Sequence, residues 1–159
     1  AAATLGAAAD VDLMPRNLQI TAPELRHLCA LGPLVSSPRA AKRLTNLYRI
    51  VRAGLSGDEL DEFIDDRYQL TQIVLAAVVG CPEITVPWFK TILGRPEGDA
   101  AAVLAPLDEM ARTNPRAGVL VERLRTCPEL QSWSRVIDVC SLAARYSFET
   151  GALLELVPG

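Results

Sequence analysis

Residues 68–82 read YQLTQIVLAAVVGCP, and this stretch decides the fold class. The run from Ile73 to Val79 is entirely apolar, and its β-branched residues would also suit a buried strand. The length of the stretch favours a buried helix instead, as do the Gly80 and Pro82 that follow it, because these residues commonly end helices. The apolar run is far shorter than the ~20 residues that a membrane-spanning helix needs. We therefore predict a buried helix over 68–79 and no association with a membrane.

The segments on either side carry signals of helix starts and ends. Capping boxes are expected at 21–24 and 56–59, and Ser37-Pro38 opens a helix whose apolar residues recur every three or four positions. No alternating stretch of convincing strand length occurs. The predicted helices cover 21–31, 38–53, 56–66, 68–79, 85–93, 100–112, 116–125 and 130–148. This pattern predicts an all-α fold, a compact bundle of about seven helices.

The same pattern divides the chain and predicts its core. Residues 1–19 are Ala-rich and then interrupted by Pro15, so we interpret them as a linker or arm. Residues 20–150 form the helical domain, and residues 151–159 are a C-terminal tail. The predicted core contains Leu44, Leu47, Val51, Ile73, Leu75, Val78, Trp133, Ile137 and Cys140.

Composition excludes several classes of function. Sixteen basic and nineteen acidic residues among 159 give a net charge of −3, which rules out a globally basic nucleic-acid binder. Four scattered cysteines and the single His27 lack metal-ligand spacing, so we expect no metal site and reduced, mostly buried thiols. No phosphate loop, dinucleotide fingerprint or nucleophile elbow occurs, so no catalytic residue is predicted. Without a secretory signal, the chain is interpreted as an excised piece of a cytoplasmic protein.

One helix concentrates positive charge. Residues 38–53 contain Arg39, Lys42, Arg43, Arg49 and Arg52 and no acid, whereas residues 58–66 contain six acids. There are two interpretations. The helix is solvent-exposed and its positive charge is balanced by the adjacent acidic segment, or its first turn binds a phosphate group. In the second case backbone donors, the helix dipole and guanidinium groups would converge on an anion.

The residues of this helix resemble a known family. The run SPRAAKRLTNLYR (37–49) looks like the helix that follows the nucleotide-binding core in bacterial KAP-type and related STAND/AAA-like P-loop NTPases. The lead-in 21–34 and the closing ARYSF (144–148) are similar to the corresponding segments of such proteins. By resemblance, the chain is a helical nucleotide-sensing lid and signal-relay region of an NTPase switch of the kind found in conflict or defence systems.

The resemblance also implies site residues and partners. Arg39 would sense the nucleotide phosphates, supported by Lys42 and Arg43. The partner would be an upstream P-loop core in the same parent chain, which would bind ATP with magnesium. The fragment itself lacks both Walker motifs, so we expect it to hold no cofactor and to be hydrolytically inactive alone.

Two other functions are compatible with the sequence. The chain could be a stand-alone helical module that binds a protein partner, or a second copy of itself, in an apolar groove between helices. Weak nucleic-acid binding through the basic helix is a third possibility, although no interleaved aromatic residues support base stacking.

Overall fold

Every regular element is helical in residues 14–158, the part of the chain that the computed structural model describes. Seven α-helices there contain nine residues or more, which confirms the predicted all-α bundle. The α-helices are α1 (Ala22–Ala30), α2 (Pro38–Ala53), α3 (Gly57–Glu62), α4 (Tyr68–Gly80), α5 (Pro82–Leu93), α6 (Ala100–Ala111), α7 (Pro115–Arg125), α8 (Trp133–Ala144) and α9 (Phe148–Gly151). Shorter helical turns are η1 (Arg16–Leu18), η2 (Gly32–Leu34), the π-helical η3 (Phe63–Arg67), η4 (Pro128–Gln131) and η5 (Ala152–Leu156).

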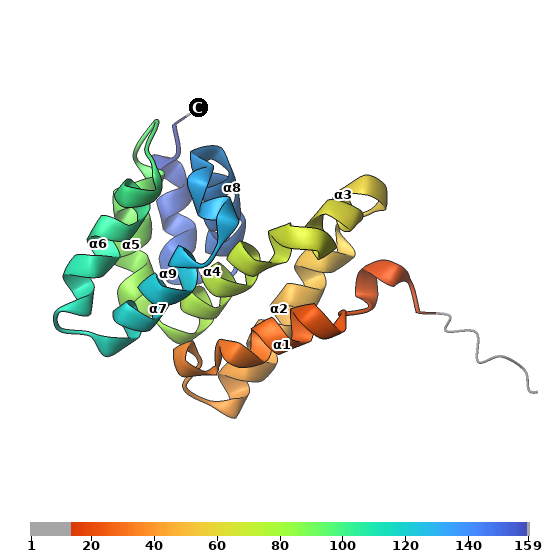
Figure 1. Cartoon of the computed structure of the whole chain (residues 1–159). Coiled ribbons are helices and arrows are strands. Elements are labelled where there is room, and N and C mark those ends of the chain that lie inside the picture. The colour runs from red at the N-terminus through yellow and green to blue at the C-terminus, as the bar shows by residue number, and fades with distance from the viewer. Residues whose placement is uncertain (1–13, 159) are drawn as a thin grey trace, which may run out of the picture.

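Helix α4 is the centre of the bundle. Every residue from Leu70 to Val78 is buried, which confirms the predicted buried helix and excludes the strand. Helices α1 and α2 pack on α4 from one side, and α5, α7 and α8 pack on it from the other (Figure 1). A helix that is apolar all round needs such enclosure, because it has no face suited to water.

The C-terminus of α4 touches the connection between α1 and α2. A Cβ atom placed on Gly80 would lie 1.9 Å from the Leu34 carbonyl oxygen, so only glycine fits there. The same carbonyl accepts a hydrogen bond from Arg116 Nη2 at 2.7 Å and one from Cys81 Sγ at 3.3 Å. These contacts fix η2 against α4, α5 and α7.

Helix starts follow the capping signals with one exception. Thr21 and Glu24 form the expected capping box, and Ser37 Oγ accepts from the Ala40 N–H at 3.2 Å. The capping box predicted at 56–59 was wrong, because the Ser56 side chain makes no capping hydrogen bond although α3 begins after it. There the chain continues through η3 into α4 without a break, held by the buried Leu60 and Phe63.

The predicted helices at 130–148 and 85–93 had wrong boundaries. The first is divided, because Ser132 caps the start of α8 and the helix ends at Ala144. The Ala144 carbonyl then accepts a hydrogen bond from Thr150 Oγ1 at 3.0 Å, which closes the turn into α9. Helix α5 starts at Pro82, whose missing N–H costs nothing in a first turn.

Most of the predicted core is buried. Leu44, Val51, Ile73, Leu75, Val78 and Cys140 are in it. Leu47, Trp133 and Ile137 are only half-buried and pack at its edge. The innermost residues are Leu44, Tyr48 and Val51 on α2, and Val136, Val139 and Cys140 on α8. Cys81 and Cys127 are buried as well, Cys29 is exposed, and all four thiols are free.

Both chain ends of the described range pack on the bundle. Asn17 Nδ2, in the predicted arm, donates to the Ala53 carbonyl at 2.8 Å. The predicted C-terminal tail contains η5, whose Leu153 and Leu154 lie against the core. Residues 1–13 of the arm and Gly159 of the tail lie outside the described range.

Candidate functional site

The three residues predicted to bind phosphate lie on one exposed face of α2. A helix turns by about 100° per residue, so the exposed residues of α2 fall within an arc of about 120°, except Pro38 and Ala41 near its start. We call this arc the basic face; it consists of Arg39, Lys42, Arg43, Asn46, Arg49, Ile50 and Ala53. It carries four cations and no acid, and Ile50 within it is 57% exposed.

The cations of the basic face are mostly unpaired. Arg39, Lys42 and Arg49 make no hydrogen bond or ion pair with their side chains in residues 14–158. Arg43 is the exception, since its Nη2 donates to the Tyr146 carbonyl oxygen at 2.7 Å. Arg43 and Tyr146 belong to the two stretches, 37–49 and 144–148, that carry the resemblance, so the fold brings these stretches together.

The turn between α8 and α9 continues this surface. Arg145 and Tyr146 line a hollow of about 460 Å³ together with Ser147. A hydrogen bond from Ser147 Oγ at 2.6 Å, helped by the positive charge of Arg43, lowers the pKa of the exposed Glu149. The charge of Arg43 on the basic face therefore reaches Glu149.

The backbone at the start of α2 offers little to an anion. Pro38 has no N–H, and the N–H groups of Ala40 and Ala41 already bond to Ser37. The Arg39 N–H alone has no acceptor among the described residues of this first turn. An anion at this helix end would thus be held mainly by side chains rather than by the cradle of backbone donors that the sequence suggested.

The acidic segment does not neutralise the basic face through ion pairs. Asp61 pairs with Arg16 at 2.6 Å, and Glu62 pairs with Arg67 at 2.7 Å. In residues 14–158 neither carboxylate reaches a cation of α2. Helix α3 follows the C-terminal end of α2, whereas Arg39 stands at its N-terminal end, about 24 Å away along a 16-residue helix.

Arg52 does not belong to the basic face, although the sequence groups it with the other basic residues of this helix. Its side chain is 1% exposed and donates from Nε to Glu24 Oε1 at 2.7 Å, while Glu24 is 0% exposed. Arg52 also donates from Nη1 to the Arg16 carbonyl at 2.8 Å. The sequence contained a signal for this position, because Arg52 follows Tyr48 by four residues and so shares the inward face of α2.

A buried polar network surrounds this ion pair and joins α1, α2 and α4. Tyr48 donates its hydroxyl proton to Glu24, and Gln72 Nε2 donates to the Glu24 carbonyl at 3.1 Å. Gln72 Oε1 lies 2.6 Å from His27 Nδ1. Sequence reasoning missed Glu24 and Gln72, since it assigned Glu24 only to the capping box and Gln72 only to an apolar helix.

The network shifts the pKa values of its members. Burial alone would raise the pKa of Glu24, but hydrogen bonds from Arg52, Tyr48 and Thr21 outweigh it and hold the pKa below the usual value. Burial and the adjacent Glu24 raise the pKa of Tyr48 well above its usual value. Burial lowers the pKa of His27, and Gln72 opposes this only in part. Glu24 is therefore ionised and His27 neutral near pH 7.

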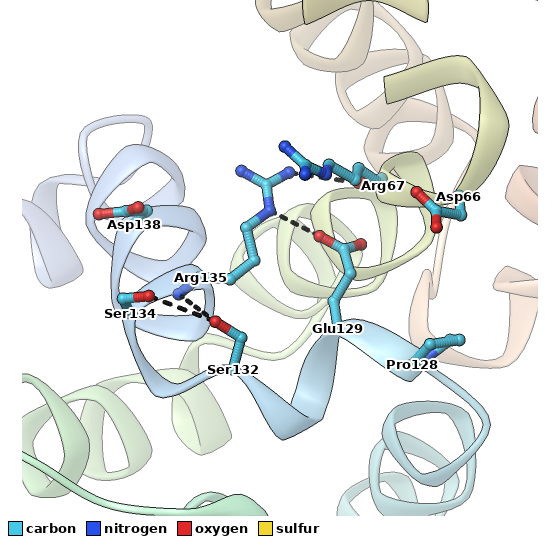
Figure 2. A pocket seen from close by; sticks show the side chains of 8 residues that line it. All are labelled: Asp66, Arg67, Pro128, Glu129, Ser132, Ser134, Arg135 and Asp138. Carbon is cyan, nitrogen blue, oxygen red and sulfur yellow. Dashed lines mark hydrogen bonds and ion pairs between the residues drawn. The ribbon is translucent and has the colours of Figure 1, made fainter. Parts of the chain in front are cut away.

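A second charged site lies where η3 and η4 meet α8. A hollow of about 410 Å³ lies there. Figure 2 shows Arg135 reaching toward Glu129 and lying beside Arg67. Arg135 Nε donates to Glu129 Oε2 at 2.6 Å, and the Leu70 N–H donates to Glu129 Oε1 at 3.3 Å. Burial raises the pKa of Glu129, although its side chain, 7% exposed, is hydrogen-bonded to Arg135. This site was not predicted from the sequence.

No nucleophile or metal centre emerges from the described residues. Burial raises the pKa of Cys81 to about 11 and that of Cys127 to about 12, so both thiols are protonated at neutral pH. In residues 14–158 no group of three histidine, cysteine or acidic side chains is placed to hold a metal ion. None of the helices in that range combines the length and apolar character needed to cross a bilayer.

Comparison with protein-family models, with curated proteins and with solved structures finds no match to this chain.

Proposed function

We propose that this chain is a non-catalytic helical module that contacts an anionic partner through the basic face of α2. The observation that carries the proposal is the set of unpaired cations Arg39, Lys42 and Arg49 on one exposed helix face. A helix with several cations and no acid repels itself, and cations are least favoured in the first turn, where Arg39 stands. A negatively charged partner would remove both costs.

The partner that the resemblance implies is the nucleotide-bearing core of a P-loop NTPase in the parent protein. In that role the module is a nucleotide-sensing lid, with Arg39 directed to the nucleotide phosphates and Lys42 and Arg43 supporting it. The contact between Arg43 and Tyr146 supports the proposal, because it joins the two stretches that resemble the family. The remaining helices would relay the position of the lid, through the buried network, to the rest of the bundle.

A stand-alone protein-interaction module is the second candidate. The exposed Ile50 favours it, because an aliphatic side chain in the middle of a charged face suits a protein surface better than a nucleotide. In that case the partner is an acidic protein, and no nucleotide turnover depends on Arg39.

Lysine footprinting of the parent protein tests the proposal. This chain has two lysines, Lys42 on the basic face and Lys90 exposed on α5, so the second is a built-in control. We expect a non-hydrolysable ATP analogue to slow acetylation of Lys42 several-fold and to leave Lys90 unchanged. Equal modification of Lys42 with and without the analogue would contradict the lid role and leave the interaction module as the better candidate.

A further inference from the structure

We propose that a trough along α8, distinct from the basic face of α2, binds a segment of a protein partner that combines basic and apolar side chains. The trough consists of three adjoining hollows of about 160, 410 and 210 Å³. The first two share Arg67 and Arg135 as a common wall, and the last two share Ser134 and Asp138. It therefore runs from the end of α3, past the N-terminal turn of α8, to the chain segment after η5.

The charges that line the trough are acidic in balance. Five carboxylates face three guanidinium groups, a net charge of −2. Two of the arginines are already neutralised, Arg67 by Glu62 at 2.7 Å and Arg135 by Glu129 at 2.6 Å. The carboxylates without an ion pair in residues 14–158 are Glu59, Asp66 and Asp138.

The arginine walls are held in place before any ligand arrives. Glu129, 7% exposed, is anchored by the Leu70 N–H and fixes Arg135, whose Nη2 also lies 3.4 Å from the Arg67 carbonyl. Figure 2 shows Asp66 and Asp138 on opposite sides of this fixed pair. A ligand would thus contact two unpaired carboxylates on either side of the hydrogen-bonded Arg135 and Glu129. Because these two side chains are already fixed, binding would cost less conformational entropy.

The far end of the trough is mainly apolar, although Arg95, which has no ion pair in residues 14–158, also lines it. Trp133 and Ile137 are half-buried there and line the third hollow with Val157 and Pro158. The Trp133 ring packs against Gly98. A Cβ atom on Gly98 would lie 2.6 Å from an atom of this ring, so no larger residue fits there without a shift. An aromatic ring fixed in this way can pack against an aliphatic or aromatic anchor of a partner.

This combination selects one class of ligand. A phosphate-bearing ligand or nucleic acid would meet unpaired carboxylates, which disfavour it. Lysine or arginine side chains would pair with Asp66 and Asp138, while an adjacent aliphatic side chain would cover Trp133. The occupant is therefore a basic, partly apolar polypeptide segment.

Peptide titrations test the proposal on the chain as it stands. The probe is a fluorescein-labelled peptide of alternating lysine and leucine pairs, read by anisotropy and by the fluorescence of Trp133, with the fully buried Trp88 as a constant background. Comparison peptides replace each lysine by glutamate, or each leucine by serine. We expect the lysine–leucine peptide to bind most tightly and to change the Trp133 emission.

Paired variants separate the trough from the general acidity of the surface. Asp66→Asn with Asp138→Asn removes two of the three unpaired carboxylates of the trough, and Glu109→Gln with Glu122→Gln removes two exposed carboxylates on α6 and α7. We expect the first pair to weaken binding about five- to tenfold and the second pair to leave it nearly unchanged. Equal affinity of the two double variants, equal binding of the glutamate peptide, or displacement of the probe by inorganic phosphate would each overturn the proposal. Because all four positions are exposed, the variants are expected to fold, and thermal melts check this.

Discussion

Arg52 and Glu24 form a fully buried ion pair across α1 and α2, with 2.7 Å between Arg52 Nε and Glu24 Oε1. Every oxygen of the Glu24 carboxylate is used, because Tyr48 and Arg52 donate to Oε1, and the Thr21 N–H donates to Oε2 at 2.7 Å. The pair therefore fixes the register of α1 on α2 and holds the helix that presents the basic face.

Breaking one half of this pair is expected to be costly. Arg52→Met leaves the Glu24 charge buried without its partner, and we expect the free energy of unfolding to fall by about 3–5 kcal/mol. Adding Glu24→Gln to Arg52→Met removes that charge and should recover part of the loss, as measured by urea unfolding. A double variant that is less stable by the sum of the two single losses would show that the groups do not act as a pair.

His27 and Glu24 each make stability fall as the pH is lowered, in two steps, whereas the raised pKa of Glu129 acts in the opposite direction. The pKa of His27 is below its ordinary 6.5 when folded, so the unfolded chain binds more protons and stability is lost as the pH falls from 6.5 through the folded value. The pKa of Glu24 is also lowered, so its contribution persists above 4.5 and is lost as the pH falls through the folded value. Thermal melts across this range should show that His27→Gln removes the first step and keeps the second.

Substitution by alanine is expected to destabilise the protein at Gly80 and to stabilise it at Gly118. Gly80→Ala places a methyl group 1.9 Å from the Leu34 carbonyl, and we expect a loss of about 3 kcal/mol or more from the resulting shift of η2. Gly118 lies inside α7 with its nearest neighbour 3.9 Å away, so Gly118→Ala should stabilise by about 0.5–1 kcal/mol. Equal effects in chemical denaturation would mean that η2 is not held against α4.

Leu44 and Leu47 on α2 differ in burial and should differ in cost. Leu44 is 4% exposed, and we expect Leu44→Ala to cost about 2–4 kcal/mol. Leu47 is half-buried, so Leu47→Ala should cost about half as much. Denaturant midpoints of the two variants measure the difference. A larger loss of stability for Leu47→Ala than for Leu44→Ala would contradict the packing of the Leu44 face of α2 against α4.

The sequence predicted the fold well because its signals were local. Caps such as Thr21 and Ser37, and the apolar run of α4, depend on neighbours within a few residues. The end of α8 at Ala144 was missed because it depends on Thr150, six residues further on, and not on a capping signal within one helical turn. Gly80 illustrates the same limit, since its role against Leu34 joins positions 46 apart.

The candidate sites were only partly visible in the sequence. Arg39, Lys42 and Arg43 could be predicted to share one face because helical periodicity fixes their relative positions. Charge alone groups Arg52 with them, although its spacing from Tyr48 places it on the inward face. Its partner Glu24, 28 residues earlier, could not be predicted from the sequence. The trough along α8 escaped notice because it combines η3, η4, α8 and the end of the chain, and no single stretch of sequence contains it.

The most direct test of the role proposed for the basic face is nucleotide turnover in the parent protein with Arg39→Ala, compared with Arg26→Ala, an exposed arginine on α1. An arginine that stabilises charge at a transferred phosphate can contribute ~10³–10⁵ in rate, and a sensing position contributes less. We expect Arg39→Ala to lower turnover or nucleotide-dependent switching at least about tenfold, with Arg26→Ala unchanged and the melting temperature of the nucleotide-free protein hardly altered. Turnover and switching that are the same in both variants would contradict the proposal that the basic face of α2 contacts a nucleotide-bearing core.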